Sequence, residues 1–265
     1  MEIRTTRQAV QLARRLGRRK VRDVERRFMI EGITFVEEAL RSGSVIECLV
    51  YSKRMLQQQR GWALLDHARE QGLPAFLVDE PLYGELSDTE TPQGVLAVVQ
   101  KPAWQQSELL QQQAGLLLTL DGLRDPGNLG TILRTGDGAG VSGVWLGRGT
   151  VDLYNPKVLR ATMGSIFRLP SFSGVDLPLL LPELKKSGWQ VVVAIPHTGQ
   201  SYFQADLRHA RLLLVIGNEA HGISRDLVAL ADQAVSIPLR PEVESLNAAV
   251  AAALLIYEVQ RQRLR

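Results

Sequence analysis

The chain has 265 residues, of which 45% are hydrophobic and 22% charged, with a formal net charge of +3 and a single cysteine, Cys48. This size favours two domains, and one cysteine excludes an intrachain disulfide. No stretch is apolar over the roughly 18 residues of a membrane span, no secretion signal is expected, and the four histidines lack the spacing of metal ligands, so the composition predicts a soluble, cytoplasmic protein without a metal.

The first 27 residues form a basic leader, with ten Lys or Arg against three Asp or Glu, while the remaining residues carry 21 against 25. Nearly all the cationic excess therefore falls on one tenth of the chain. A segment of this charge fits an arm that binds a polyanion such as nucleic acid, which we favour. The alternative is a solvated face of a helix.

After the leader, short β-branched runs alternate with runs whose apolar residues recur every three or four positions, which predicts a small α/β module. Strands are expected at 27–30, 45–51, 75–78 and 95–99, and helices at 32–41 and 56–70. Residues 101–113 are polar and weakly patterned, as in a linker. The expected organisation is therefore a first domain over 1–100, a linker over 101–113 and a second domain over 114–265.

The second domain is predicted as an α/β fold with helices between its strands. Strands are expected at 116–120, 143–146, 190–195, 212–216 and 234–237. Their near-continuous apolar character is typical of a parallel sheet covered on both faces. The last helix, expected at 245–260, is rich in alanine and apolar nearly all round, so it is expected to pack against the sheet, a second subunit, or both.

A G-x-G-x-x-G pattern, from Gly138 through Gly140 to Gly143, suggests a dinucleotide site. Such a loop follows a strand and opens a helix, whereas this one closes a helix and leads into a strand. We therefore reject a nicotinamide-dependent oxidoreductase. The glycines are expected to supply left-handed conformations that end the helix.

Three polar segments follow predicted strands, at the sheet edge where open α/β proteins bind ligands. They are Asn-Leu-Gly-Thr-Ile-Leu-Arg at 128–134, Gly-Asn-Glu-Ala-His-Gly at 217–222, and Ile-Pro-Leu-Arg-Pro-Glu-Val-Glu-Ser-Leu-Asn at 237–247. Each has an ordinary explanation, because Asn128 and Ser245 suit helix N-caps and Glu219 could cap the next helix. Arg134, beside the same crevice, could grip a phosphate with its planar fork.

Together, in this order, the three segments resemble the signature motifs of the SpoU (TrmH-type) RNA ribose methyltransferases of the SPOUT class. Residues 155–167 resemble a further family segment, and 28–32 with 91–95 resemble the ribosomal-protein-like substrate-binding domain that often precedes the catalytic one. The resemblance implies an α/β protein in which a small substrate-binding domain precedes a parallel-sheet domain with a deep trefoil knot.

The resemblance also implies S-adenosyl-L-methionine as cofactor and a ribose 2′-hydroxyl of structured RNA, most simply ribosomal RNA, as methyl acceptor. It implies a homodimer with the site at the interface. The cofactor is expected to contact Gly217, Ile237 and Leu246. The residues with implied roles in the reaction are Asn128, Arg134, Glu219, Ser245 and Asn247.

Two alternatives remain, a transfer RNA substrate and a non-catalytic RNA-binding protein that keeps the fold. The intact motif residues argue against the second. A free guanidinium is a poor base, so Arg134 would need help from an RNA phosphate. His221 is not specified by the family pattern and is left out. Pro241 stands where a glycine is usual, which predicts a different shape for the cofactor loop.

Overall fold

The computed structural model describes residues 3–196 and 199–264, so His197 lies outside the described residues. The chain divides into two compact units. The first comprises Met1–Ala103 and Tyr154–Phe167, and the second comprises Trp104–Leu153 and Arg168–Arg265. The contacts thus add Tyr154–Phe167 to the first unit, whereas the contiguous boundaries read from the sequence stay a prediction. No helix in the described ranges is long and apolar enough to cross a membrane.

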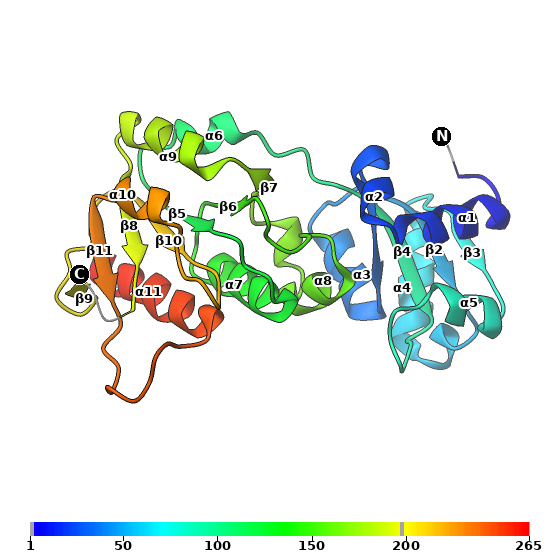
Figure 1. The fold of residues 1–265 in the computed structure, drawn as a ribbon. Helices are drawn as coiled ribbons and strands as arrows, with labels where there is room; N and C mark the ends of the chain where they lie inside the picture. Colours follow the sequence, from blue (N-terminus) through cyan, green and yellow to red (C-terminus); the bar gives the residue numbers. More distant parts are fainter. Residues whose placement is uncertain (1–2, 197–198, 265) are drawn as a thin grey trace. The chain divides into compact units, whose positions relative to one another are not determined.

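The first unit contains a mixed sheet in the order β1, β4, β2, β3. Its central strand β4 is antiparallel to both β1 and β2, while β3 joins β2 in parallel. The strands are β1 (Arg27–Glu31), β2 (Ile46–Tyr51), β3 (Ala75–Leu77) and β4 (Val95–Gln100). The helices are α1 (Thr6–Leu16), α2 (Arg19–Glu25), α3 (Ile33–Arg41), α4 (Gln59–Glu70), α5 (Glu80–Leu86) and α8 (Pro156–Thr162), seen in Figure 1. The predicted small α/β module is confirmed.

The basic leader folds as α1 and α2 and is not a free arm. Thr5 caps α1 through a reciprocal pair of hydrogen bonds with Gln8. The apolar face of α1, with Leu12 and Leu16, is buried in the same core cluster as Val98 of β4. The segment folds in this way because its charges alternate with apolar residues at helical spacing, and that apolar face needs a core. Its expected binding of nucleic acid stays a prediction.

The second unit contains a parallel sheet in the order β7, β6, β5, β10, β8, β11, β9. Its strands are β5 (Gly115–Leu120), β6 (Gly143–Gly147), β7 (Ser171–Val175), β8 (Gln190–Ala194), β9 (Gln200–Ser201), β10 (Arg211–Ile216) and β11 (Gln233–Ser236). All the predicted strands are present. The two edge strands β7 and β9 were missed because β7 is polar and largely solvent-accessible and β9 has only two residues.

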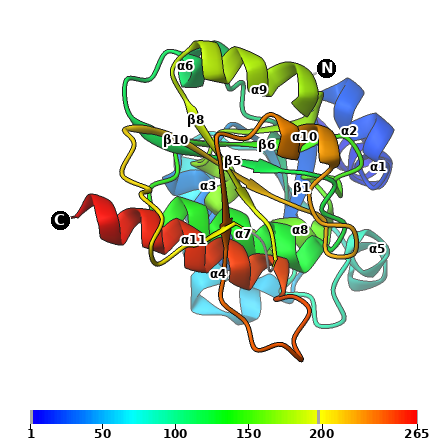
Figure 2. The same cartoon turned by 60° about the vertical axis from the view of Figure 1, so that its left-hand side comes forward.

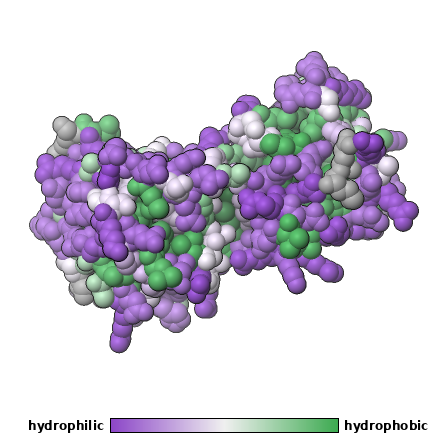
Figure 3. All heavy atoms as spheres, turned by 90° about the horizontal axis from the view of Figure 1, so that it is seen from above, coloured by the Kyte–Doolittle hydropathy of each residue, from purple (hydrophilic) through white to green (hydrophobic). Residues whose placement is uncertain are grey.

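Helices cover both faces of this sheet (Figures 1 and 2). On one face lie α6 (Gln106–Leu110), α9 (Leu177–Lys186) and α10 (Arg225–Ala229), whose leucines share a core cluster with Trp145 and Trp189. On the other face α7 (Pro126–Gly138) packs against α11 (Ala248–Arg263). The parallel α/β class is confirmed, and α6 is a short helix inside the expected linker. Polar side chains cover most of the surface seen in Figure 3.

The glycine-rich segment ends a helix as expected, but of its three glycines only Gly140 is left-handed. Gly138 is the last residue of α7, Gly140 has φ +73°, and Gly143 opens β6. A Cβ at Gly143 would lie within 3.4 Å of several Leu109 side-chain carbons, so this glycine lets α6 pack on the sheet. No dinucleotide loop forms here.

Candidate active site

Two loops that leave adjacent strands are tied together at the carboxyl edge of the sheet. β5 and β10 are parallel neighbours, so the loops after Leu120 and Ile216 emerge side by side. The Asp121 carboxylate accepts a hydrogen bond from the Ser224 backbone N–H at 2.8 Å, and the Asn218 side-chain amide donates to the Gly122 carbonyl at 2.6 Å. These two hydrogen bonds hold the first and second motifs next to each other.

A chain of hydrogen bonds joins one residue from each motif. The Asn128 amide donates to Glu219 Oε1 at 3.1 Å, and the Asn247 amide donates to Asn128 Oδ1 at 2.8 Å. Glu219 also accepts the backbone N–H groups of Arg124 and Asp125 at 3.2 and 3.3 Å. The sequence named these three side chains, and the structure brings them into direct contact.

Neither Asn128 nor Glu219 has the ordinary capping role that the sequence suggested for it. Asp125, not Asn128, caps α7, because the Asp125 carboxylate accepts the Asn128 N–H at 2.7 Å. Glu219 does not cap α10, whose N-cap Ser224 makes no side-chain cap bond. Partial burial alone would raise the pKa of Glu219, but the hydrogen bonds from Asn128 and from backbone N–H groups outweigh it and lower the pKa. The carboxylate is therefore held ionised.

The second motif forms a tight loop that needs glycine at its first position. Asn218 and Gly222 exchange both backbone hydrogen bonds at 2.9 Å. A Cβ on Gly217 would lie 2.5 Å from Ile223 N and closer still to the Gly222 carbonyl carbon, so no other residue fits without displacing the backbone. Asn218 Oδ1 accepts from the N–H groups of Ala220 and His221, which makes Asn218 the organiser of the loop.

A pocket of about 470 Å³ opens between this loop, the ends of β8 and β11, and the start of α11. All three residues expected at the cofactor, Gly217, Ile237 and Leu246, line it, together with Ser245 and Glu219. Its volume lies within the range of small-ligand sites. Its apolar walls suit an adenine ring, and its carboxylates suit the cationic sulfonium of S-adenosylmethionine. The residues present therefore fit this cofactor.

The third motif forms the rim of the pocket and differs from expectation at two positions. Asn247, not Ser245, is the N-cap of α11, since Asn247 Oδ1 accepts the N–H groups of Ala249 and Val250. Ser245 makes no hydrogen bond to the described part of the chain. Pro241 is exposed and occupies the second position of a turn closed by the Val243 N–H and Arg240 carbonyl, which suits its fixed φ.

Arg134 lies apart from the hydrogen-bonded chain. It lies six positions after Asn128 on α7, a rise of about 9 Å. Its side chain is exposed and makes no hydrogen bond or ion pair with any residue that the structure describes. Asp137, which shares its face of the helix, pairs with Arg168 at 2.6 Å. The guanidinium is therefore free to engage an external anion.

The motifs, the hydrogen-bonded loops and the pocket agree with the SpoU family that the sequence resembles. The SpoU rRNA methylase family matches residues 115–257, and the MRM3-like substrate binding domain matches residues 7–97. The chain belongs to the SpoU rRNA methylase family. The resemblance read from the motifs is confirmed, as is the α/β class with a parallel sheet and a preceding substrate-binding domain.

Several relatives resemble this SpoU protein over most of its length. The 23S rRNA (guanosine(2553)-2′-O)-methyltransferase RlmP of Bacillus subtilis is 36% identical over 93% of this chain and 94% of its own. Human mitochondrial rRNA methyltransferase 3 is 30% identical over 92% of this chain and 70% of its own. The crystal structure of the SpoU methyltransferase AviRb from Streptomyces viridochromogenes with AdoMet has a TM-score of 0.87 at 29% identity, covering 98% of this chain and 99% of that one.

Sequence reasoning missed part of the SpoU site. Asp121 and Asn218 tie the loops, and Glu244 lines the pocket. Asn218 stands inside the second motif, so its position was a usable signal. Glu244 stands inside the third motif in the same way. Asp121 carries no such signal, because a carboxylate in a polar loop reads as a solvated residue until the opposite loop is known.

Proposed function

We propose that this protein transfers a methyl group to a ribose 2′-hydroxyl of ribosomal RNA. It is an RNA methyltransferase of the SpoU family, and S-adenosyl-L-methionine is its cofactor. The observation that carries the proposal is the chain from Asn247 through Asn128 to Glu219 beside a pocket of cofactor size. Ribosomal RNA is favoured over transfer RNA because the relatives that match nearly the whole chain include named rRNA methyltransferases.

The cofactor supplies an activated methyl group when it is bound, so the protein must position the hydroxyl and remove its proton. Gly217, Ile237 and Leu246 would hold the cofactor through the loops that line the pocket. Glu219, fixed by three N–H donors, keeps the loop before α7 against the loop after β10. Correct alignment of two reactants contributes about 7–11 kcal/mol to lowering a barrier.

Arg134 is proposed as the residue that engages the RNA at the reacting nucleotide. Its free, exposed guanidinium can form a two-point contact with a phosphate, which lysine cannot reproduce. A guanidinium does not release its proton near neutral pH, so it accepts the hydroxyl proton only with help from that phosphate. Ser245, with an unengaged hydroxyl on the pocket rim, and Asn247 are proposed to hold the ribose.

The first unit is proposed to bind the RNA through exposed cations on α1, α2 and the turn between them. Arg7, Arg18 and Lys20 are exposed and have no ion pair within the described ranges. Arg22, in contrast, is buried and donates to the Leu16 and Gly17 carbonyls, so it serves the fold. Removing residues 1–27 would strip a core helix, so point substitutions are the correct test.

The triple replacement of Arg7, Arg18 and Lys20 by glutamine should weaken RNA binding and lower the dependence of log K on log salt. Each lost phosphate contact removes about 0.9 units of slope on duplex or 0.7 on single strands. The matched control replaces three other exposed cations without a described ion pair, namely Lys53, Lys186 and Arg225. Equal slopes in the two triple variants would leave the cations of α1 and α2 as solvated surface.

We also propose a homodimer formed through α11. Val250, Leu254 and Tyr257 are 49%, 38% and 55% exposed and lie on one face of the helix, opposite its buried residues. An unpartnered apolar stripe of this kind is typical of an interface. Leu254→Glu should give a monomer by light scattering, while the control Leu179→Glu, at a 69% exposed residue of α9, should not. A wild-type monomer would end this part of the proposal.

Two further features implied by the family stay predictions. A trefoil knot is supported by the position of β10 between β5 and β8, and by two hydrogen bonds between the loop after β10 and the loop after β5. A cytoplasmic location is expected from the proposed RNA substrate.

Which RNA is modified is tested by mapping alkali-resistant bonds in total RNA. The RNA is taken from a strain lacking the protein and from its parent, since a 2′-O-methyl group blocks cleavage of the adjacent phosphodiester. We expect the strain lacking the protein to lose one alkali-resistant bond in ribosomal RNA. A bond lost in transfer RNA instead would make transfer RNA the substrate.

A further inference from the structure

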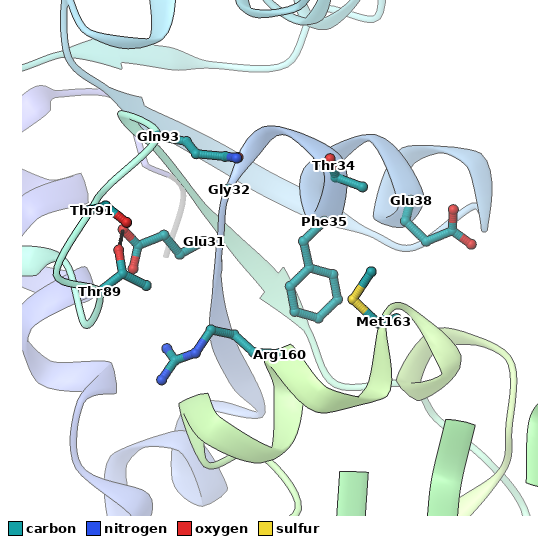
Figure 4. Close-up of a pocket in the computed structure, with 10 residues that line it drawn as sticks. All are labelled: Glu31, Gly32, Thr34, Phe35, Glu38, Thr89, Thr91, Gln93, Arg160 and Met163. Atoms are coloured by element: carbon teal, nitrogen blue, oxygen red, sulfur yellow. Dashed lines mark hydrogen bonds between the residues drawn. The ribbon is translucent and has the colours of Figure 1, made fainter. Parts of the chain in front are cut away.

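The first unit contains a pocket of about 340 Å³ that the reaction does not use. It lies between the start of α3, the loop before β4, and α8 with the residue that follows it (Figure 4). Figure 4 shows two unlike walls. Phe35 and Met163 stand side by side on one side, and Glu31 with its threonine neighbours stands on the other.

Glu31 forms a preorganised acceptor wall. Its Oε1 accepts the hydroxyls of Ser87 and Thr89 at 2.6 and 2.9 Å, while Oε2 accepts the Asp88 N–H at 3.1 Å. Glu31 has no ion pair within residues 3–196 and 199–264, so its negative charge is not neutralised by a protein cation. A carboxylate oxygen accepts more than one hydrogen bond, so Oε2 retains capacity for a donor from a ligand.

The opposite wall is formed by Phe35 and Met163, with Thr34 and Glu38 of α3 beside them, and is partly open to solvent. The Phe35 ring is half-buried, with the Phe167 ring centroid 5.5 Å away, which fixes its position. Met163 is 56% exposed and has φ +48°, in the left-handed region that long side chains seldom adopt. An aromatic face beside a polarisable thioether is a surface on which a flat ring packs.

The pocket also offers polar groups at its ends. Gln93 Oε1 accepts the Ile33 N–H at 2.8 Å, which leaves the Gln93 side-chain NH₂ without a partner in the described ranges. Arg160 contacts Asp88 through one nitrogen at 3.2 Å and is 36% exposed, so part of its guanidinium remains available. The ligand that fits is therefore flat, carries N–H donors for Glu31, and has an anionic group for Arg160.

We propose that this pocket receives one unstacked nucleobase of the RNA substrate. The ring packs on Phe35 and Met163, an exocyclic amino group donates to Glu31, and the attached phosphate meets Arg160. This inference rests on the proposed function for its RNA substrate, and the match of residues 7–97 to a substrate binding domain agrees with it. Proteins read single-stranded RNA by stacking splayed bases on aromatic side chains and bonding their edges.

The acceptor wall predicts which bases enter. Cytosine presents an amino group at C4, whereas uracil presents a carbonyl oxygen there, which would face the Glu31 carboxylate. A hydrogen bond to a charged group contributes about tenfold or more in affinity. The pocket should therefore prefer CMP over UMP by about tenfold.

The test measures binding of CMP and UMP to the full chain by saturation-transfer NMR, with S-adenosylhomocysteine added in excess so that its site is filled. Glu31→Gln should abolish the preference for CMP. Phe35→Leu, which keeps apolar bulk, and Met163→Ala, which removes an exposed side chain, should weaken binding of both nucleotides. The matched control is Trp62→Ala, because Trp62 is a 48% exposed aromatic of the same unit that does not line the pocket.

Undetectable CMP binding, equal binding of CMP and UMP, or binding that survives Met163→Ala and Phe35→Leu unchanged would each overturn the inference. Methyl transfer to ribosomal RNA by the wild type is measured in parallel. If transfer occurs and CMP does not bind, the inference fails and the proposed function stands. If no RNA is methylated, the proposed function itself fails.

Discussion

Glu219→Gln perturbs the bond that links the first two motifs. The amide carbonyl can still accept from Asn128 and Asp125, but its NH₂ group would face the Arg124 N–H that Glu219 Oε2 accepts at 3.2 Å. Losing one exposed charge-assisted bond and setting two donors against each other costs about 1 kcal/mol of unfolding free energy. The melting temperature should fall by about 2–4 °C.

The rate should change far more than the stability. A displacement of about 1 Å at a reacting centre lowers turnover by about 100-fold. Glu219 holds both the Asn128 side chain and the Asp125 backbone N–H at the start of α7, so its loss is expected to displace Asn128. The assay is single-turnover methyl transfer to ribosomal RNA at saturating substrates, with differential scanning calorimetry for stability. The matched control is Glu242→Gln, at an exposed carboxylate without a described partner. Wild-type rate and melting temperature in Glu219→Gln would refute the reasoning.

The lowered pKa of Glu219 predicts that the stability lost in Glu219→Gln depends on pH. Hydrogen bonds lower the folded-state pKa of Glu219 below its ordinary value of 4.5, so its contribution to stability is present above that pH and is lost as pH falls through the folded pKa. The difference in urea midpoint between wild type and Glu219→Gln should therefore be largest near neutral pH and shrink under acid conditions. A difference that grows with acidity would contradict the lowered pKa.

Five further substitutions, at four residues, test the rest of the site. Gly217→Ala should abolish S-adenosylmethionine binding by calorimetry while the protein stays folded, because its Cβ would lie 2.5 Å from Ile223 N; unchanged affinity would remove Gly217 from the cofactor site. Arg134→Ala and Arg134→Lys should both lose methyl transfer by orders of magnitude and keep cofactor affinity, and near-normal single-turnover rates would make Arg134 a solvated residue. Asn247→Ala should cost about 1 kcal/mol of unfolding free energy as a lost cap, whereas Ser245→Ala should leave stability unchanged and reduce transfer; equal stabilities would contradict the assignment of the cap.

Elements with a strong apolar pattern, periodic or continuous, were predictable from the sequence. β5 and β10 are continuous apolar runs, so a buried parallel sheet was the direct interpretation. β7 was not, because Ser171–Val175 pairs along one edge only and is half open to solvent, so burial does not select its side chains. The role of α1 in the core was obscured by its charges, since counting charge does not separate the two faces of a helix.

Within the site, the sequence identified the residues and the structure supplied their contacts. Asn128 was named from a motif 91 positions before Glu219 and 119 before Asn247, but the hydrogen bonds that join the three depend on which strands are neighbours. The pocket around Glu31 was not predictable at all. It requires Met163 and Arg160, which are distant in sequence from α3 and enter the first unit only through the fold.

The central claim, methyl transfer to a ribose oxygen of ribosomal RNA, is tested most directly with S-adenosylmethionine labelled in its methyl group. Purified protein is incubated with ribosomal RNA lacking the modification, and the RNA is then hydrolysed by alkali. A methylated 2′-hydroxyl protects the adjacent phosphodiester, so the account predicts that the label appears in one alkali-resistant dinucleotide and that Arg134→Ala abolishes it. Label recovered in mononucleotides would show methylation of a base and would contradict the account.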